Sequence, residues 1–189
     1  VFSVLGLILS SPFFAVIALM IKCTDRGAVF YRQDRLTQNG KVFSICKFRT
    51  MIQDAEKDTG ARLASDHDDR ILPVGKFLRR TRLDELPQLW NILKGEMSVV
   101  GPRPERPELA EEIEKEIPEF HDRLKVKAGL TGYAQIYGKY NTTSYDKLKL
   151  DLSYIRKYSV FLDLKLILMT PKIMFMKEST EGVKEDGHN

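Results

Sequence analysis

Cysteine and histidine are scarce in this sequence, which limits the metal and disulfide chemistry that it can support. Its 189 residues include 2 cysteines, Cys23 and Cys46, and 3 histidines. Two cysteines far apart in the chain provide no disulfide framework and are compatible with a reducing compartment. The scattered histidines form no His-Glu-x-x-His pattern, so the sequence also lacks neighbouring thiolate or imidazole ligands for a zinc ion.

The sequence also lacks a strong excess of either charge. Lysine and arginine number 30 against 26 aspartate and glutamate residues, which gives a formal net charge of +4. This mildly basic balance suits acidic membrane surfaces or phosphorylated substrates, and it is too weak to indicate nucleic acid. The length suffices for one domain with its own core, and no repeat or linker marks a second soluble domain.

Charge is missing altogether from residues 1 to 21, which are almost wholly apolar. A continuous helix of this length would reach roughly 30 Å, enough to cross a bilayer core. Pro12 interrupts the run directly after Ser11, and a serine hydroxyl can bond a carbonyl that proline leaves free. Residues 1 to 22 are therefore predicted to lie in a membrane, as a kinked spanning helix or as a re-entrant pair of half-helices. A signal peptide is a third option, although no Ala-x-Ala-like cleavage site follows.

Two adjacent carboxylates, Asp84 and Glu85, stand between a basic and an apolar segment. Arginines precede them at positions 79, 80 and 82. Apolar residues follow at helical spacing: Leu86, Leu89, Trp90 and Leu93. This spacing predicts a helix with one buried face, and Pro87 is tolerated only in its first turn, which places Asp84 at or near the N-cap. The helix dipole there would keep Asp84 ionised and nucleophilic, although a simple helix cap is the commoner role of such a pair.

Adjacent carboxylates repel each other unless a cation lies between them. Without histidine or cysteine nearby, a hard ion held by oxygen, above all Mg²⁺, fits this pair best. The arginines before the pair would supply fixed positive charge for phosphate groups. The alternative is that they form a solvated basic face.

Two further basic positions lie in constrained backbone. Residues 27 to 51 are predicted to form a strand pair around Asn39-Gly40, with Lys47 and Arg49 on one face, where two cations could hold a diphosphate. A solvated strand edge is the alternative. Later in the chain, prolines fix φ on both sides of Arg103 and present its guanidinium in a set direction, as phosphoryl transfer requires. A plain connecting turn is the alternative there.

The rest of the sequence is predicted to be mainly helical. Residues 107 to 127 suggest an amphipathic helix broken near Pro118, and two more helices follow over 145 to 158 and 160 to 176. The last one is apolar but carries charges, so we predict that it lies on a bilayer surface, with a buried core helix as the alternative. The tail from 177 to 189 is polar and predicted to be disordered. The fold class is thus α+β, mainly helical, with a small β-hairpin and interfacial amphipathic helices.

Several motifs in order resemble one protein family. They are Lys47-Phe48-Arg49-Thr50-Met51, Asp69-Arg70, Gly75-Lys76-Phe77-Leu78-Arg79, Leu83-Asp84-Glu85-Leu86-Pro87 and Val100-Gly101-Pro102-Arg103-Pro104. Together they resemble the signature series of the bacterial sugar transferases, which are monotopic polyprenyl-phosphate phosphoglycosyltransferases. These enzymes begin the assembly of capsule, exopolysaccharide and O-antigen. The resemblance runs from about residue 1 to about residue 176, and several ordered motifs are far more specific than any one of them.

The resemblance implies a phosphotransferase that moves a sugar-1-phosphate from a UDP-sugar to polyprenyl (undecaprenyl) phosphate and releases UMP. Asp84 would attack the β-phosphorus to form a covalent aspartyl-phosphosugar, and Glu85 would hold the cofactor Mg²⁺. The phosphate- or substrate-binding residues that it implies are Lys47, Arg49, Arg79, Arg103, Asp151 and Asp163. It also implies a re-entrant segment over residues 1–22, broken at Ser11 and Pro12, before a catalytic domain over 23–176.

The implied location is the cytoplasmic face of the bacterial inner membrane, and the implied partners are a UDP-sugar, polyprenyl phosphate and the lipid bilayer. A homodimer and downstream glycosyltransferases are further candidate partners, and no nucleic acid is expected. Two other functions stay open at this point. One is a membrane-anchored phosphatase that uses an aspartyl-phosphate, and the other is a non-enzymatic membrane scaffold for polysaccharide assembly. The sequence does not identify the sugar.

Overall fold

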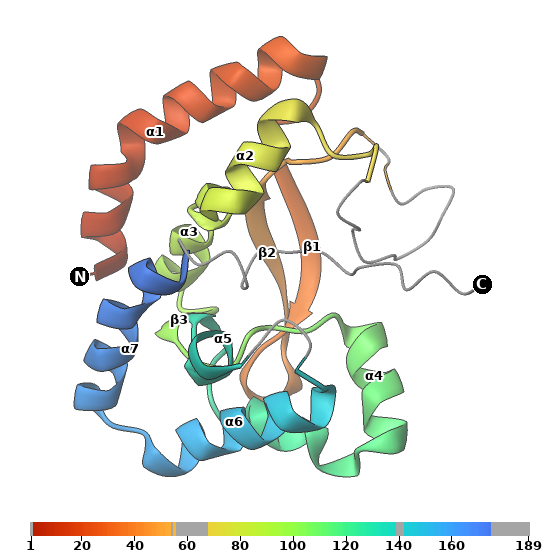
Figure 1. Ribbon diagram of the computed structural model, residues 1–189, viewed down its shortest axis with the longest axis vertical. Helices are drawn as coiled ribbons and strands as arrows, with labels where there is room; N and C mark the ends of the chain where they lie inside the picture. The colour runs from red at the N-terminus through yellow and green to blue at the C-terminus, as the bar shows by residue number, and fades with distance from the viewer. Residues whose placement is uncertain (1, 54, 56–67, 139–141, 175–189) are drawn as a thin grey trace.

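The structure is a computed structural model that describes residues 2–53, 55, 68–138 and 142–174. It has the α+β, mainly helical fold that the sequence predicts. Figure 1 shows a β-hairpin that runs between two groups of helices, one from the N-terminal half and one from the C-terminal half of the chain. The predicted tail from 177 to 189 lies outside the described residues.

Helix α1 (Phe2–Asp25) is the longest element, and its apolar stretch is long enough to cross a membrane. The helix continues through Pro12. Because Pro12 cannot donate to the carbonyl of Ile8, that oxygen is free to accept the hydroxyl of Ser11, at 2.8 Å. The break predicted at Ser11 and Pro12 is therefore a bend within one helix, which changes direction part-way along its length (Figure 1), and not a gap between two helices. The re-entrant topology stays a prediction.

The predicted hairpin is confirmed. Strand β1 (Phe30–Leu36) pairs antiparallel with β2 (Val42–Phe48), and the turn η1 (Gln38–Gly40) joins them. Asn39 and Gly40 adopt positive φ angles of 60° and 70°, which explains why Asn-Gly occupies this turn.

The carboxylate pair lies between two helices, and it belongs to neither of them. Helix α2 (Pro73–Thr81) begins at a proline and is capped by Arg82, whose φ of 53° lies in the left-handed region. A single 3-10 turn, η2 (Leu83–Glu85), follows and holds both acids. Helix α3 (Gln88–Leu93) begins only after Pro87. Asp84 is therefore inside the turn that precedes α3, and the predicted N-cap position was wrong.

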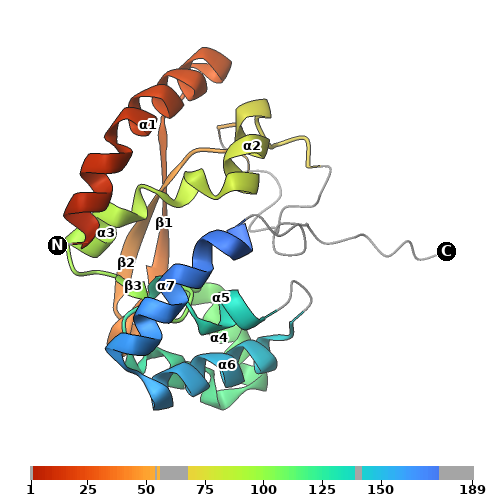
Figure 2. The ribbon, with the colours of Figure 1, turned by 60° about the vertical axis from the view of Figure 1, so that its left-hand side comes forward.

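The buried face predicted around α3 is only partly confirmed: Leu86 packs against the core and Leu89 is half-buried. Trp90 is 50% exposed and Leu93 44% exposed, whereas Gln88 and Asn91 are almost fully buried. Asn91 is buried because its side-chain amide bonds the backbone of β2: it accepts from Cys46 N at 3.0 Å and donates to Ser44 O at 2.9 Å. Figure 2 shows α3 beside α1, and many side chains of α1 are also apolar and exposed. Trp90 and Leu93 thus point to the surroundings, while Ile92 and the buried amides face the core and Leu89 lies against α1.

The C-terminal half covers the other end of the hairpin. Its elements are β3 (Ser98–Val100), α4 (Pro107–Glu116), η3 (Pro118–Lys125), β4 (Gly129–Thr131), α5 (Tyr133–Tyr137), α6 (Ser144–Lys157) and α7 (Val160–Met174). The helix break near Pro118 and the two C-terminal helices are confirmed. The parallel pair of β3 and β4 was not predicted, because three-residue strands carry too little periodicity to be recognised.

Candidate active site

Glu85 lies between two cations that come from distant parts of the chain. Its Oε1 accepts from Lys47 Nζ at 3.0 Å and from Arg103 Nη2 at 2.6 Å. The hairpin and the Gly-Pro-Arg-Pro turn therefore meet at η2. Burial alone would raise the pKa of Glu85. The charges of Arg103 and Lys47 outweigh that effect and hold the pKa far below the usual range of a glutamate. Glu85 is accordingly ionised and neutralised by its partners.

Asp84 differs sharply from its neighbour, since within the described part of the chain its carboxylate has no hydrogen bond or ion pair. Burial and the charge of Glu85 raise the pKa of Asp84 to about 6, against the opposing influence of Lys47, Arg79 and Arg103. The carboxylate is still mostly ionised at neutral pH, and it is more basic than an ordinary aspartate. An unengaged, basic carboxylate is suited to nucleophilic attack. The sequence predicted that a helix dipole would keep Asp84 ionised. That prediction is corrected, because burial is the largest influence on the pKa of Asp84 and raises it.

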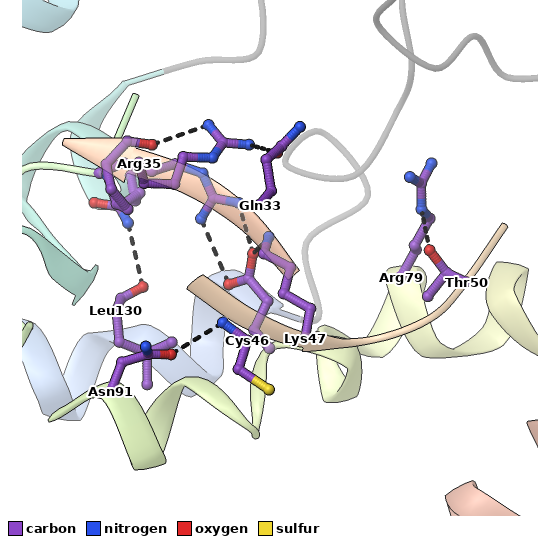
Figure 3. A network of polar contacts seen from close by, with 12 residues as sticks. Gln33, Arg35, Cys46, Lys47, Thr50, Arg79, Asn91 and Leu130 are labelled. Carbon is purple, nitrogen blue, oxygen red and sulfur yellow. Dashed lines mark hydrogen bonds and ion pairs between the residues drawn. The ribbon is translucent and has the colours of Figure 1, made fainter. Parts of the chain in front are cut away.

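Two arginines of the basic segment add positive charge beside the pair. Arg79, in the last turn of α2, donates from Nε to Thr50 Oγ1 at 3.0 Å (Figure 3), and its charge acts on Asp84. Arg82 connects α2 to η2, and burial lowers its pKa with a further contribution from the charge of Arg103. Lys47 and Arg103 thus contact Glu85 directly, whereas Arg79 bonds Thr50 and acts on Asp84 through its charge alone.

The segment that carries Arg103 is fixed by hydrogen bonds on all sides. Gly101 N donates to Thr131 O, and Gly129 N donates to Pro102 O, both at 2.9 Å. Arg35 donates from Nη1 to Pro104 O at 3.1 Å. A Cβ on Gly101 would lie 2.3 Å from a backbone oxygen, so only glycine allows this close approach. The rigid presentation predicted for Arg103 is therefore seen in the backbone of this segment.

Arg49 is placed elsewhere than the sequence predicts. Its guanidinium is buried against Gly27 and forms an ion pair with Asp25, at the end of α1. Lys47 and Arg49 both belong to the end of the hairpin, but their side chains reach different acids. Arg49 therefore connects α1 to the end of β2, and the predicted diphosphate contact of Arg49 is corrected.

Asp151 and Asp163 also contact protein groups away from the carboxylate pair. Asp151, on α6, forms an ion pair with Arg123, whose Nη2 lies 2.7 Å from Oδ2. Burial raises the pKa of Asp151, which Arg123 opposes. Asp163, on α7, accepts from the hydroxyl of Tyr154 at 2.8 Å. Both acids therefore stabilise the C-terminal half around the Arg103 segment. Their side chains are bound to Arg123 and Tyr154, so their geometry does not favour direct contact with a substrate phosphate.

No set of three or more histidine, cysteine or acidic side chains that could hold a metal ion occurs among the residues with described positions. Mg²⁺ commonly binds through one or two carboxylates and completes its shell with water and substrate phosphates. Asp84 and Glu85 provide such donors. Glu85 Oε2 has only a 3.5 Å contact with Arg103 among the described residues, so it is less engaged than Oε1. The donors present are thus oxygens of the kind that Mg²⁺ prefers, and Glu85 Oε2 with Asp84 would be the atoms to hold such an ion.

Sequence reasoning missed Arg35, Arg123 and Tyr154, which hold the Arg103 segment from outside. Arg123 Nη2 donates to Arg103 O at 2.9 Å, and Tyr154 Oη, whose hydrogen goes to Asp163, lies 3.4 Å from Val100 O. Arg35 and Arg123 are single arginines in charged stretches. No local pattern distinguishes them from solvated residues, and only the tertiary contacts reveal them.

The fold and the site define a domain with an apolar N-terminal helix and a carboxylate pair set among basic side chains. The chain belongs to the bacterial sugar transferase family, whose model matches residues 1–177. It is 44% identical over 182 residues to the UDP-glucose:undecaprenyl-phosphate glucose-1-phosphate transferase of Klebsiella pneumoniae, a match that covers 94% of this chain and 39% of the relative.

Two more relatives extend the comparison. The UDP-N-acetylgalactosamine-undecaprenyl-phosphate N-acetylgalactosaminephosphotransferase of Aeromonas hydrophila is 38% identical over 171 residues, 89% of this chain and 40% of that protein. The exopolysaccharide production protein ExoY of Rhizobium meliloti (strain 1021) is 37% identical over 184 residues, 87% of this chain and 78% of that protein. The chain thus spans only about two fifths of the first two relatives.

Proposed function

We propose that the chain is a membrane-associated phosphotransferase that moves a sugar-1-phosphate from a UDP-sugar to undecaprenyl phosphate. The observation that carries the proposal is the contrast between the two acids. Glu85 is neutralised by Lys47 and Arg103, while Asp84 is unengaged and has a pKa raised to about 6. A free, basic carboxylate beside three phosphate-binding cations is suited to attack on phosphorus. The relatives of Klebsiella pneumoniae and Aeromonas hydrophila are named for a UDP-sugar and undecaprenyl phosphate, which supports both substrates.

In the first step, an Asp84 oxygen attacks the β-phosphorus of the UDP-sugar. The bond from that phosphorus to the oxygen bridging the two phosphates breaks, UMP leaves with the electron pair, and an aspartyl-phosphosugar forms. In the second step, an oxygen of the lipid phosphate attacks the same phosphorus and displaces Asp84. Dividing the transfer into two displacements is the usual advantage of covalent catalysis.

The surrounding residues neutralise charge during both steps. Lys47 and Arg103 already share one oxygen of Glu85, and Arg79 acts on Asp84 from α2. These cations would bind the non-bridging phosphate oxygens, whose charge shifts as the bond breaks. A bound Mg²⁺, held by Glu85 with Asp84 beside it, would add Lewis-acid stabilisation of the diphosphate.

The lipid substrate requires that the site lie near a membrane. Helix α1 supplies an apolar segment of sufficient length, and exposed apolar residues continue onto α3. We infer that the site faces the cytoplasm at the inner membrane, where a soluble nucleotide and a lipid phosphate can meet. The reaction would be the first membrane step of bacterial surface polysaccharide synthesis.

Intact-mass measurement tests the covalent step. Purified protein in nanodiscs would be mixed with Mg²⁺ and each of a panel of UDP-sugars, without lipid, and compared with Asp84→Asn and with Asp34→Asn, an exposed aspartate of β1. We expect a sugar-phosphate adduct on Asp84 in the wild type and in Asp34→Asn, and none in Asp84→Asn. Undecaprenyl phosphate should discharge the adduct, and the reactive sugar would be identified at the same time.

The other outcomes separate the alternatives. Release of free sugar phosphate without lipid would favour an aspartyl-phosphate phosphatase. No adduct with any UDP-sugar, and no UMP when lipid is added, would overturn the transferase and leave a non-enzymatic scaffold.

A further inference from the structure

We propose that Arg123 is a positioning residue for Arg103 and that the buried carboxylate of Asp151 holds Arg123 in place. This role rests on the proposed function, in which Arg103 binds the substrate phosphate. Arg123 belongs to η3 and Asp151 to α6, so the contact between these two elements would serve the site.

One nitrogen atom makes both contacts. Arg123 Nη2 donates to the main-chain carbonyl of Arg103 at 2.9 Å, and it lies 2.7 Å from Asp151 Oδ2. Arg123 is 6% exposed and Asp151 1% exposed. The guanidinium also lies over the ring of Phe120, with its carbon 4.8 Å from the ring centroid. These contacts leave the Arg123 side chain little freedom, so it can fix the carbonyl that it bonds.

The side chain of Arg103 needs such an anchor. It is 41% exposed, so packing fixes only part of it. Its direction depends on the backbone of residue 103, whose carbonyl precedes the nitrogen of Pro104. Arg35 and Gly129 hold the carbonyls on either side, and Arg123 holds the one that belongs to Arg103 itself. A rotated carbonyl would move the guanidinium away from Glu85 and the phosphate position.

The energetics of burial argue against a purely passive pair. Removing two charges from water is expensive, and well-packed neutral groups commonly stabilise a core as well or better. The pair provides one thing that a neutral pair does not, a charged donor aimed at the Arg103 carbonyl. Its geometry therefore points to positioning of the phosphate-binding arginine.

The test replaces the pair by amides, Arg123→Gln together with Asp151→Asn, which leaves no unpaired charge in the core. The matched control is Lys125→Gln with Asp122→Asn, an ion pair of 2.9 Å in the same η3 element that has no contact with Arg103 among the described residues. We expect kcat/KM for the UDP-sugar to fall about 100-fold in the first variant, the size typical of a displaced catalytic group, and to stay unchanged in the control. Arg123→Lys with Asp151 intact should keep part of the activity.

A double-mutant cycle with Arg103→Ala shows whether Arg123 acts through Arg103. If it does, the amide pair costs almost nothing further once Arg103 is absent. Full additivity of the two losses, or wild-type kcat/KM in the amide pair, would overturn the proposal.

Hydrogen exchange provides a measurement that does not depend on activity. Amides in the peptide over residues 101–106 should exchange several-fold faster in the amide pair than in wild type and control, while β1 and β2 keep their rates. Unchanged exchange at 101–106 would also overturn the proposal. If wild-type protein showed no transferase activity, the proposed function would fail, but the exchange experiment would still decide whether Arg123 positions the segment.

Discussion

At the scale of single residues, Asp84 and Glu85 are neighbours whose pKa values move in opposite directions. The pKa of Asp84 is raised to about 6, so Asp84 accepts a proton as the pH falls through that value. We expect the rate of adduct formation to fall about tenfold per pH unit below about pH 6 and to level off above about pH 7. Lipid should be left out, because its own phosphate titrates. A rate that stays constant down to about pH 5 would show that Asp84 has an ordinary pKa.

The raised pKa of Asp84 also predicts the stability of Asp84→Asn. The folded state binds the proton of Asp84 more tightly than the unfolded state, in which the pKa is near 3.8. Ionisation therefore costs stability as the pH rises from the unfolded pKa to the folded pKa, by on the order of 1.4 kcal/mol for each pH unit between them. Asp84→Asn should be inactive yet melt above the wild type at about pH 8, with a smaller difference at about pH 5. Asp34→Asn is the control, and an inactive variant with a lower Tm at both pH values would contradict the burial of Asp84.

Substitution of Lys47 should mainly lower activity, whereas substitution of Arg49 should mainly lower stability. Lys47 contacts Glu85 in the site, whereas Arg49 is buried against Asp25 at the end of α1. Lys47→Gln should lower kcat/KM by about 100-fold or more with a modest change in Tm, as loss of a preorganised charge does. Arg49→Gln should mainly lower the free energy of unfolding, by about 1.5–3 kcal/mol, the range for a hydrogen bond to a charged group. Equal effects of both variants on kcat/KM would instead support a diphosphate site shared by the two cations.

The sequence predicted some of these residues because their chemistry is local. The adjacent acids and the Arg103 between two prolines each form a short sequence motif, and the structure brings the two motifs into contact. Arg49 and Asp151 were misplaced because strand periodicity and motif resemblance say nothing about which acid or base a side chain will meet. Arg123 could not be found at all, since its two partners lie 20 positions before it and on α6.

At the scale of elements, the exposure of Trp90 and Leu93 on α3 is the most informative difference from the sequence prediction. Apolar spacing identified an amphipathic helix, but it could not say whether the apolar face meets protein or lipid. Exposed apolar residues of α3 continue those of α1, while Asn91 bonds β2. We infer that the exposed face of α3 meets the bilayer, which would hold the carboxylate pair near the headgroups.

Trp90 is the only tryptophan in the chain and reports on this face directly. It is 50% exposed, so in water without detergent its fluorescence emission would lie at the long wavelength of a solvent-exposed indole. In vesicles we expect a blue-shifted emission that brominated lipids quench, because tryptophan prefers the membrane interface. Trp90→Phe with Phe161→Trp, on the exposed side of α7, would test the interfacial orientation of that helix in the same way. Emission of Trp90 that vesicles leave unchanged would contradict a lipid-facing α3.

At the scale of the whole molecule, α1 exposes apolar side chains on one side and packs into the protein core on the other. Ile17 and Ile21 are buried in a cluster with Phe48, Leu72, Val74 and Leu78. That cluster includes β2 and α2, the elements that carry Lys47 and Arg79. The predicted boundary at residue 22 therefore separates sequence segments whose side chains share one core.

This dual role predicts opposite results for substitutions on the two sides of α1. Ile21 is fully buried, so Ile21→Ala should lower the free energy of unfolding in detergent by about 2–5 kcal/mol and reduce adduct formation. Leu9 is 67% exposed, so Leu9→Ala should change that free energy by less than about 0.5 kcal/mol, because little protein contact is lost. Leu9→Asn should instead weaken vesicle binding while leaving adduct formation in detergent intact, since a polar amide is costly only where lipid surrounds it. Equal destabilisation by Leu9→Ala and Ile21→Ala in detergent would mean that the exposed side of α1 is covered by protein, and a second copy of the chain would then be the occupant to look for by measuring mass in solution.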